Sequence, residues 1–339
     1  MTAPPQVTFA LMAYRQERLV RTAIEGTFAQ TGAPLEIILS DDASPDGTFA
    51  VMEAMAAAYR GPHTVRLNRN PVNLGILGHV NRLFALASGD LVVTAAGDDV
   101  SEPDRSARVA AAWEAGRGRV FAVHSAVREI DGAGRPGPLR PPPAAVATPD
   151  ASPSPLLIAR EMANCIGATA AWDRAVFDRF GPLPETREAV EDGPLFFRAA
   201  LLGDIAYLDA PLVRWRTDGL SGDSGLSPGR DYLQGNRIKF RKWVLANMQS
   251  WMRDLETARA QGLACPEADE ILDICRWRTR RFGYDVALAR RPPLGRIAFL
   301  PVAAAISLRH RRNYHLREAW RQALGPLWAW WHDRGAVQR

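Results

Sequence analysis

Cysteine is scarce in this chain of 339 residues, and its three copies form no paired pattern. Cys165, Cys265 and Cys275 are odd in number, and no histidine lies near them at a spacing typical of zinc sites. Both a disulfide framework and a zinc site are therefore disfavoured. We expect three apolar cysteines in buried positions.

The chain also lacks an apolar run long enough to cross a membrane. The run IAFLPVAAAISL at 297–308 has 12 residues and contains Pro301, whereas a bilayer-spanning helix needs about 20 apolar residues. The first residues, MTAPPQVTFALM, lack the cationic start and apolar stretch of a signal peptide. We therefore predict a cytoplasmic protein.

Acidic residues are nearly absent from one part of the C-terminal region. Between Arg276 and Arg312 stand ten arginines and a single acid, Asp285. PLWAWW follows at 326–331, and Trp together with Arg is typical of membrane interfaces. We predict peripheral contact of 292–331 with the inner face of the cell membrane. A solvated helix face and ordinary core packing remain alternatives.

The net charge of +5 and the pI near 9.4 are compatible with a nucleic-acid partner. The basic residues, however, are interleaved with bulky apolar side chains rather than with stacking aromatics alone. We therefore expect no nucleic acid.

The first half of the chain has a regular alternation of apolar, β-branched runs and helical patterns. Strand, helix and strand in repetition predict an α/β fold with a mainly parallel sheet wrapped by helices. The expected buried strands are 7–12, 35–40, 64–68 and 91–96, and the expected helices between them are 16–30, 47–60 and 76–87.

The second half is less regular. Residues 131–155 contain eight prolines and predict a loop without regular structure, either inert or a flap near a substrate. A further strand is expected at 205–211. From about 231 onward the pattern is helical and rich in Arg and Trp, so we place a domain boundary near Gly229.

Two pairs of acids follow predicted strands. Asp41 and Asp42 end the second strand, and Asp98 and Asp99 follow the fourth. Because the carboxyl ends of parallel strands meet at one edge, where ligands of such sheets bind, the two pairs are expected on the same edge. Adjacent acids repel one another unless donors or a cation meet them, so a divalent-cation site is one interpretation, and turn or cap residues are the other.

Three blocks carry a resemblance to a known family. VTFALMAYRQERLVRTAIEGTFAQTGAPLEIILSDDASPDGT resembles the opening of the inverting family 2 glycosyltransferases, and NLGILGHVNRLFALASGDLVVTAAGDD resembles their next block. NCIGATAAWDRAVFDRFGPLPETREAVEDGPLFFRAALLGDIAYLDAPLVRWR is similar to the acceptor half. The agreement runs from about Val7 to Ser221, with the blocks in the family's order.

The resemblance implies a GT-A fold, that is, a Rossmann-like nucleotide-sugar domain with a mainly parallel sheet flanked by helices. It would occupy 1–229, with a donor half at about 1–105 and an acceptor half at about 106–229. Residues 230–339 would form a helical, Arg- and Trp-rich C-terminal extension.

The resemblance also implies the donor site. Asp42 matches the aspartate that hydrogen-bonds the nucleobase, and Asp41 stands beside it. The positions expected around the base and ribose are Met12, Ala13, Tyr14 and Glu17.

A cation, Mn²⁺ or Mg²⁺, is implied by Asp98, which matches the last acid of the family's D-x-D motif. Asp99 is expected to orient Asp98 or a sugar hydroxyl. The first acid of the motif is replaced by Ala96, so fewer protein oxygens would bind the cation.

On the acceptor side, Asp192 matches the general base, and Glu191 precedes it. Arg216 falls near the place of a family segment that contacts the diphosphate, although Asp218 stands where a histidine is usual. Arg15 is a further departure, since asparagine is usual at its position.

The sequence thus predicts an inverting, metal-dependent glycosyltransferase that uses a nucleoside-diphosphate sugar, UDP-linked, and a glycan or lipid-linked acceptor in cell-surface polysaccharide synthesis. One alternative is a catalytically weak or inactive protein of the same fold that binds a membrane or a partner. A sugar nucleotidylyltransferase is disfavoured, because ALMAYRQE after the first strand contains no glycine.

Overall fold

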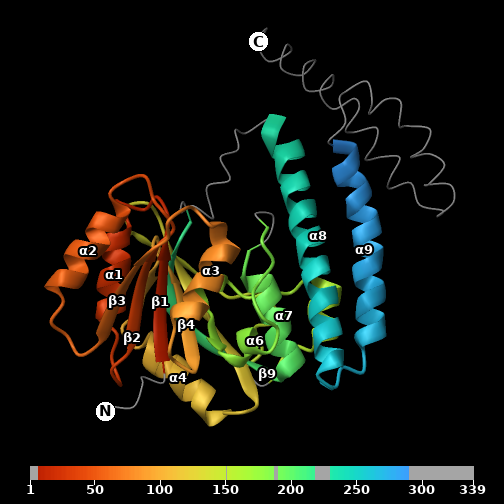
Figure 1. Cartoon of the computed structure of the whole chain (residues 1–339), viewed down its shortest axis with the longest axis horizontal. Coiled ribbons are helices and arrows are strands. Elements are labelled where there is room, and N and C mark those ends of the chain that lie inside the picture. The colour runs from red at the N-terminus through yellow and green to blue at the C-terminus, as the bar shows by residue number, and fades with distance from the viewer. Residues whose placement is uncertain (1–6, 150, 187–189, 218–229, 290–339) are drawn as a thin grey trace, which may run out of the picture. The chain divides into compact units, whose positions relative to one another are not determined.

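The computed structural model describes residues 7–149, 151–186, 190–217 and 230–289 (Figure 1). The chain divides into two compact units. The first comprises Met1–Asp223 and Ser250–Ile274, and the second comprises Ser224–Gln249 and Cys275–Arg339. The predicted boundary near Gly229 and the predicted membrane segment 292–331 lie outside the described residues.

A single mixed sheet forms the centre of the first unit. Its strand order is β3-β2-β1-β4-β8-β6-β9-β5, with β7 paired to β6. The first four strands are parallel to one another, and β8 runs antiparallel to β4. The strands are β1 Val7–Ala13, β2 Glu36–Asp41, β3 Thr64–Arg69, β4 Leu91–Ala96, β5 Val100–Ser101, β6 Val120–Ile130, β7 Pro136–Arg140, β8 Ala171–Asp173 and β9 Asp204–Arg216.

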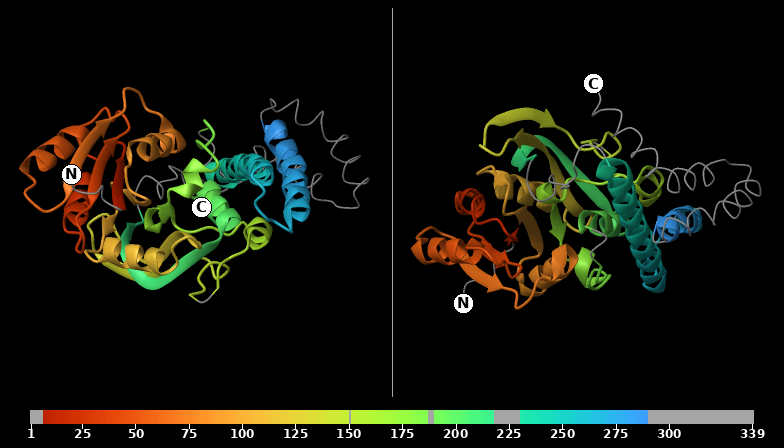
Figure 2. Two further views of the ribbon diagram at one scale, coloured as in Figure 1. Left: turned by 60° about the horizontal axis from the view of Figure 1, so that its bottom comes forward. Right: turned by 90° about the horizontal axis from the view of Figure 1, so that it is seen from above.

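Helices cover this sheet, and two long helices follow it. The helices α1 and α2 pack against each other and against the first strands, and α4 packs against β6. The last two helices, α8 and α9, lie side by side (Figures 1 and 2). The helices are α1 Val20–Phe28, α2 Thr48–Ala58, α3 Gly75–Leu86, α4 Arg105–Ala115, α5 Pro155–Glu161, α6 Ala175–Asp178, α7 Asp192–Leu202, α8 Arg230–Ala260 and α9 Ala268–Ala289, with a 3₁₀ turn at Gly167–Thr169.

The apolar runs form the core as expected. Every residue of β1 is buried, and its register places Phe9 opposite Ile37 of β2 and Val93 of β4. Burying a side chain of this size stabilises a fold by about 1.5–3 kcal/mol. The α/β fold with one sheet flanked by helices is therefore confirmed. The sheet is mixed, and the predicted parallel pairing holds among β3, β2, β1 and β4 and between β6 and β9.

The prediction that 64–68 is a buried strand is wrong in one respect. Residues Thr64–Arg69 do form a strand, but β3 pairs only with β2 and lies at the edge of the sheet, so most of its side chains are exposed. A short apolar run does not distinguish a central strand from an edge strand.

The prediction that 131–155 has no regular structure is also wrong in part. Pro136–Arg140 forms β7, which pairs antiparallel with β6. Proline cannot donate to a β ladder, but β7 has only this one neighbour, so the lost N–H groups of Pro136 and Pro138 are tolerated at the edge. Pro155 opens α5, where Ser154 caps the helix.

Two other expected elements differ in length. The first helix begins at Val20 rather than at 16, because Gln16 is held outside it by a hydrogen bond from its N–H to Thr48 Oγ1 (2.8 Å). The strand expected at 205–211 runs from Asp204 to Arg216 and pairs along β6. This extra length brings Arg216 to the acids that follow β4.

All three cysteines lie in the described part of the chain, and none is in a disulfide. Cys165 and Cys275 are buried as expected, whereas Cys265 is only partly so. Among the described helices, none combines the length and the apolar character needed to cross a bilayer.

Candidate functional site

The carboxyl ends of β1, β2 and β4 form one edge of the sheet. In the register of these strands, Ala13 lies opposite Asp41, and Met12 lies opposite Ala96. A cavity of about 330 Å³ opens beside this edge. Its lining includes Met12, Ala96, Asp98, Asp99, Cys165, Glu191, Asp192 and Arg216. Asp98 and Asp99 therefore face one cavity together with Glu191 and Asp192, whereas Asp41 and Asp42 do not line it.

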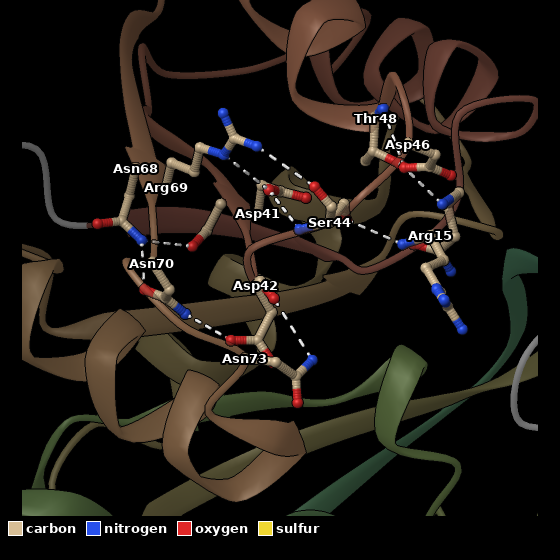
Figure 3. A network of polar contacts seen from close by, with 12 residues as sticks. Arg15, Asp41, Asp42, Ser44, Asp46, Thr48, Asn68, Arg69, Asn70 and Asn73 are labelled. Atoms are coloured by element: carbon tan, nitrogen blue, oxygen red, sulfur yellow. Dashed lines mark hydrogen bonds and ion pairs between the residues drawn. The ribbon is translucent and has the colours of Figure 1, made fainter.

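The Asp42 carboxylate is held by three N–H donors, of which Figure 3 shows Asn70. Its Oδ1 accepts hydrogen bonds from Asn70 Nδ2 (2.8 Å) and the Leu74 N–H (2.9 Å), and its Oδ2 accepts one from the Gly75 N–H (2.9 Å). Leu74 and Gly75 begin α3, so the carboxylate caps that helix. Within the chain, Asp42 therefore acts as a cap residue, which was one of the two interpretations of this acid.

Asp41 is fully buried under Arg69 (Figure 3). One carboxylate oxygen accepts the Ser44 N–H (2.9 Å) and lies 3.6 Å from Arg69 Nε. The other oxygen is buried and accepts no hydrogen bond from the described residues. Arg69 in turn lies over the ring of Phe49, at 5.1 Å.

The predicted nucleotide positions are only partly brought together. Met12 lines the cavity, whereas Ala13, Tyr14, Glu17, Asp41 and Asp42 do not. Tyr14 is half-buried beneath the Arg15 guanidinium at 5.6 Å, and Glu17 accepts the Gly47 N–H at 3.0 Å. These residues form the neighbouring stretch of the same sheet edge.

Arg15 has a left-handed backbone with φ of 55°, which asparagine adopts more readily than arginine. Its N–H donates to Ser44 Oγ at 2.9 Å (Figure 3). This hydrogen bond helps to hold the strained conformation.

Asp98 and Asp99 are both buried in the turn after β4. Burial and the charge of Asp98 raise the pKa of Asp99 to about 7. Asp99 Oδ1 accepts the Arg216 N–H (2.8 Å), and Arg216 Nε donates to the Asp98 carbonyl (3.0 Å). Arg216 also donates to the Asp131 carbonyl (2.6 Å), so its guanidinium fixes the acid turn.

Asp98 and Asp99 offer oxygen ligands that suit a divalent cation, but they do not form a complete metal site. Within the described residues, no cluster of three or more His, Cys, Asp or Glu side chains could hold a metal alone. Two adjacent buried carboxylates are nevertheless oxygen ligands of the kind that Mg²⁺ and Mn²⁺ use, and a cation would offset the repulsion that raises the pKa of Asp99.

Arg105 was not singled out from the sequence. It is fully buried and donates to Ser101 Oγ (2.9 Å) and to the Thr94 carbonyl (2.8 Å), so it joins β4 to β5 on both sides of the acid turn. Burial lowers the pKa of Arg105 to about 9, although the charge of Asp99 partly opposes this shift. An arginine at the start of a helix is normally exposed. The position of Arg105 in the sequence therefore did not indicate that it is buried beside the acid turn.

Glu191 and Asp192 lie at the N-terminus of α7. Glu191 is buried, and Asp192 is half-buried at the cavity. Burial raises the pKa of both carboxyls, and the charge of Asp192 raises that of Glu191 further. Asn164, which the sequence analysis did not single out, donates to Asp192 and partly offsets the rise, as does the Gly193 N–H at 2.7 Å.

His79 and His124 lie on apolar segments, and neither lines the cavity. His79 is buried, and its Nε2 lies 2.6 Å from Ser40 Oγ. His124 packs against Phe196 and Tyr207, and burial lowers its pKa to about 4.

Comparison with known proteins identifies the family. The sequence model of Glycosyl transferase family 2 matches residues 8–181, just over half of the chain. The chain belongs to glycosyl transferase family 2. It is therefore a transferase enzyme by family, and the nucleotidylyltransferase alternative is set aside.

Curated relatives of this glycosyltransferase are similar over part of their length. The Bacillus subtilis protein EpsE is 33% identical over 105 residues, which is 31% of this chain and 37% of EpsE. The succinoglycan biosynthesis protein ExoO of Rhizobium meliloti is 32% identical over 128 residues, 38% of this chain and 35% of ExoO. The chain thus spans about a third of the length of these relatives.

Solved structures share the fold of this glycosyltransferase. Residues 1–349 of Staphylococcus aureus TarS, crystallised with UDP, superpose with a TM-score of 0.60 at 16% identity, covering 94% of this chain and 89% of that one. The mannosyltransferase PcManGT from Pyrobaculum calidifontis, in complex with GDP-Man and Mn²⁺, gives 0.54 at 19% identity, covering 95% and 88%. The GT-A fold with a helical C-terminal region is confirmed.

Proposed function

We propose that this glycosyltransferase moves a sugar from a nucleoside-diphosphate sugar to a hydroxyl of a glycan or lipid-linked acceptor, with inversion, and that Asp192 is the base. The observation that carries the proposal is the single cavity that Asp98, Asp99 and Asp192 line together. A UDP-linked donor is proposed because TarS was crystallised with UDP and with UDP-GlcNAc, although PcManGT was crystallised with GDP-Man.

The reaction is a single displacement. Asp192 accepts the proton of the acceptor hydroxyl while that oxygen forms a bond to the anomeric carbon. The bond from the anomeric carbon to the nucleoside diphosphate breaks, and the diphosphate leaves with the bonding pair. The buried surroundings of Asp192 make it more basic than an exposed aspartate, which suits it to take this proton.

Asp98 would hold a divalent cation, with Asp99 beside it, and the cation would offset the charge of the diphosphate. Arg216 would fix the acid turn and add positive charge near it. We assign the nucleotide to the adjacent edge, with Met12, Ala13, Tyr14 and Glu17 near base and ribose. Asp42 would hydrogen-bond the base, with Asp41 beside it.

The first test is calorimetric titration of UDP and GDP with and without Mn²⁺, on the wild type and on Asp98→Ala. Cation-dependent binding of one nucleotide that is lost in the variant is the expected result. Absence of nucleotide binding under all conditions would instead support the alternative of a catalytically inactive interaction module.

A peripheral location on the inner face of the cell membrane is part of the proposal. The segment 292–331 is outside the described residues, but an aromatic and cationic patch on α8 and α9, which precede it in the sequence, supports the proposed location. Phe240 and Trp277 are 53% and 45% exposed, and Phe282 and Arg281 join them, with Arg281 lying 4.9 Å from the Trp277 ring. Aromatic rings and cations together favour an anionic lipid surface.

Sedimentation with vesicles tests the location. We expect binding to vesicles that contain phosphatidylglycerol and not to neutral vesicles, and weaker binding after deletion of residues from 292 onward. Equal partitioning of the deleted and full-length chains would contradict the assignment to 292–331.

A further inference from the structure

The last part of the first unit contacts the helix that begins with Asp192. We propose that Trp251 and Asp254 of α8 are positioning residues, which hold α7 so that the Asp192 carboxylate stays in place at the cavity. The inference rests on the proposed function, in which Asp192 is the base.

The carboxylate of Asp192 is tied to the first turn of α7. Asp192 Oδ1 accepts the Gly193 N–H at 2.7 Å, and the Leu195 N–H donates to the Glu191 carbonyl at 3.0 Å. Any movement of this turn therefore moves the carboxylate. Displacement of a catalytic group by 1 Å can lower a rate by about 100-fold, so the turn needs a rigid support.

Trp251 contacts this turn directly. Its indole N–H donates to the Gly193 carbonyl at 3.2 Å, and its ring stacks on Phe197 with centroids 4.9 Å apart. Trp251 is only 2% exposed, so both contacts are made in the core. One tryptophan thus fixes α7 at two points on one helix face, since Gly193 and Phe197 are four residues apart.

Asp254 makes the second anchor, one turn further along α8. Asp254 Oδ1 lies 3.1 Å from the terminal nitrogen Nη2 of Arg198, and both side chains are almost fully buried. The N–H does not point at this oxygen, so the contact is an ion pair rather than an aligned hydrogen bond. Arg198 Nη1 also donates to the Gly181 carbonyl at 2.8 Å. The arginine therefore joins α7 to α8 and to the turn that follows α6.

The polar character of the Trp251 and Asp254 contacts indicates that they orient α7 and do not serve only to bury apolar surface. A pair of leucines could bury comparable apolar area without the cost of desolvating two charges. An indole N–H aimed at a backbone carbonyl and an ion pair one turn away fix the rotation and the register of α7 against α8. The part of α8 that makes these contacts belongs to the same unit as the cavity.

The test compares Trp251→Phe with a matched control, Trp113→Phe. Both substitutions keep a buried aromatic ring and remove one indole hydrogen bond, but Trp113 donates to Asp173, at the opposite end of β4 from the acids. Hydrogen–deuterium exchange of peptides over 190–200 and steady-state kinetics are measured on both. We expect the Trp251 variant alone to show faster exchange there and a kcat about tenfold lower, with the donor KM within about twofold of wild type.

Asp254→Asn is the second variant, in case Trp251→Phe does not fold, and the same pattern is expected for it. Exchange over 190–200 and kcat equal to those of the Trp113 variant would overturn the inference and leave only a structural role. If the wild type transfers no sugar and Asp192→Asn changes nothing, the proposed function fails. The exchange rates then still decide whether α8 holds α7.

Discussion

The two acidic regions of the site differ in the partners that their carboxylates have. At the donor edge, Asp42 accepts three N–H groups and Asp41 accepts one beside Arg69. At the acceptor edge, Glu191 is buried and Asp192 is half-buried at the cavity, and the pKa of both is raised although Asn164 and the Gly193 N–H donate to Asp192. Asp41 and Asp42 are thus tied to neighbouring elements of the fold, whereas Asp192 reaches the cavity with a raised pKa. The first region is suited to a positional role and the second to taking a proton.

The largest effect that tests this contrast is expected for Asp192→Asn. The amide cannot accept the acceptor proton, so kcat should fall by about 100- to 10,000-fold, while nucleotide affinity measured by calorimetry stays unchanged. A variant that keeps more than a tenth of the wild-type kcat would contradict the assignment of the base.

The same substitution should stabilise the fold at neutral pH. Folding raises the pKa of Asp192 above the ordinary 3.8, so the ionised form costs stability as pH rises above that value. Urea unfolding at pH 7.5 should show Asp192→Asn more stable by on the order of 1 kcal/mol, with the difference vanishing below pH 3.8.

A loss of stability is expected at the donor edge instead. Asp42→Ala removes the acceptor of three N–H groups at the start of α3 and should cost about 1–3 kcal/mol in urea unfolding. The control Asp104→Ala breaks only an exposed ion pair with Arg108 and should change stability by less than about 0.5 kcal/mol. Equal effects of the two substitutions would show that Asp42 has no capping role.

The pH profile of kcat sharpens the contrast. The acid limb should lie well above pH 3.8, because Asp192 must be ionised to act and burial raises its pKa. Asn164→Ala removes a donor to the ionised form and should move the limb upward by on the order of half a pH unit. Asn81→Ala is the control. It removes an asparagine that is hydrogen-bonded to the backbone of Leu183, and it should not move the acid limb.

A last effect concerns the missing first acid of the motif. Ala96 lines the cavity at the end of β4, so Ala96→Asp adds a carboxylate beside Asp98. We expect the Mn²⁺ affinity of the nucleotide complex to rise about three- to tenfold, since affinity follows the charge of the ligand set. Ala96→Asn, with the same shape and no charge, is the matched control and should show no gain.

The sequence predicted those parts of the molecule that depend on local pattern. The first strands follow from apolar runs, and the blocks of the family pattern pointed to Asp98 and Asp192, which the structure brings to one cavity and whose roles stay predictions. It did not predict Arg105, Asn164, Trp251 or Asp254, because each acts through a partner that is remote in the chain or by burial of a normally exposed side chain. The edge position of β3 and the pairing of β7 depend likewise on which strands are neighbours.

The placement of β5 has a consequence for engineering. This two-residue strand precedes residue 105 and so falls in the predicted donor half, yet it pairs with β9 of the predicted acceptor half at the far end of the strand order. Donor strands therefore bracket the acceptor strands on both sides, and the two halves are interlaced rather than joined end to end. A chimera that joins two family members at residue 105 would pair β5 of one protein with β9 of the other. We therefore expect functional chimeras when the whole sheet comes from one protein, and not when each half comes from a different one.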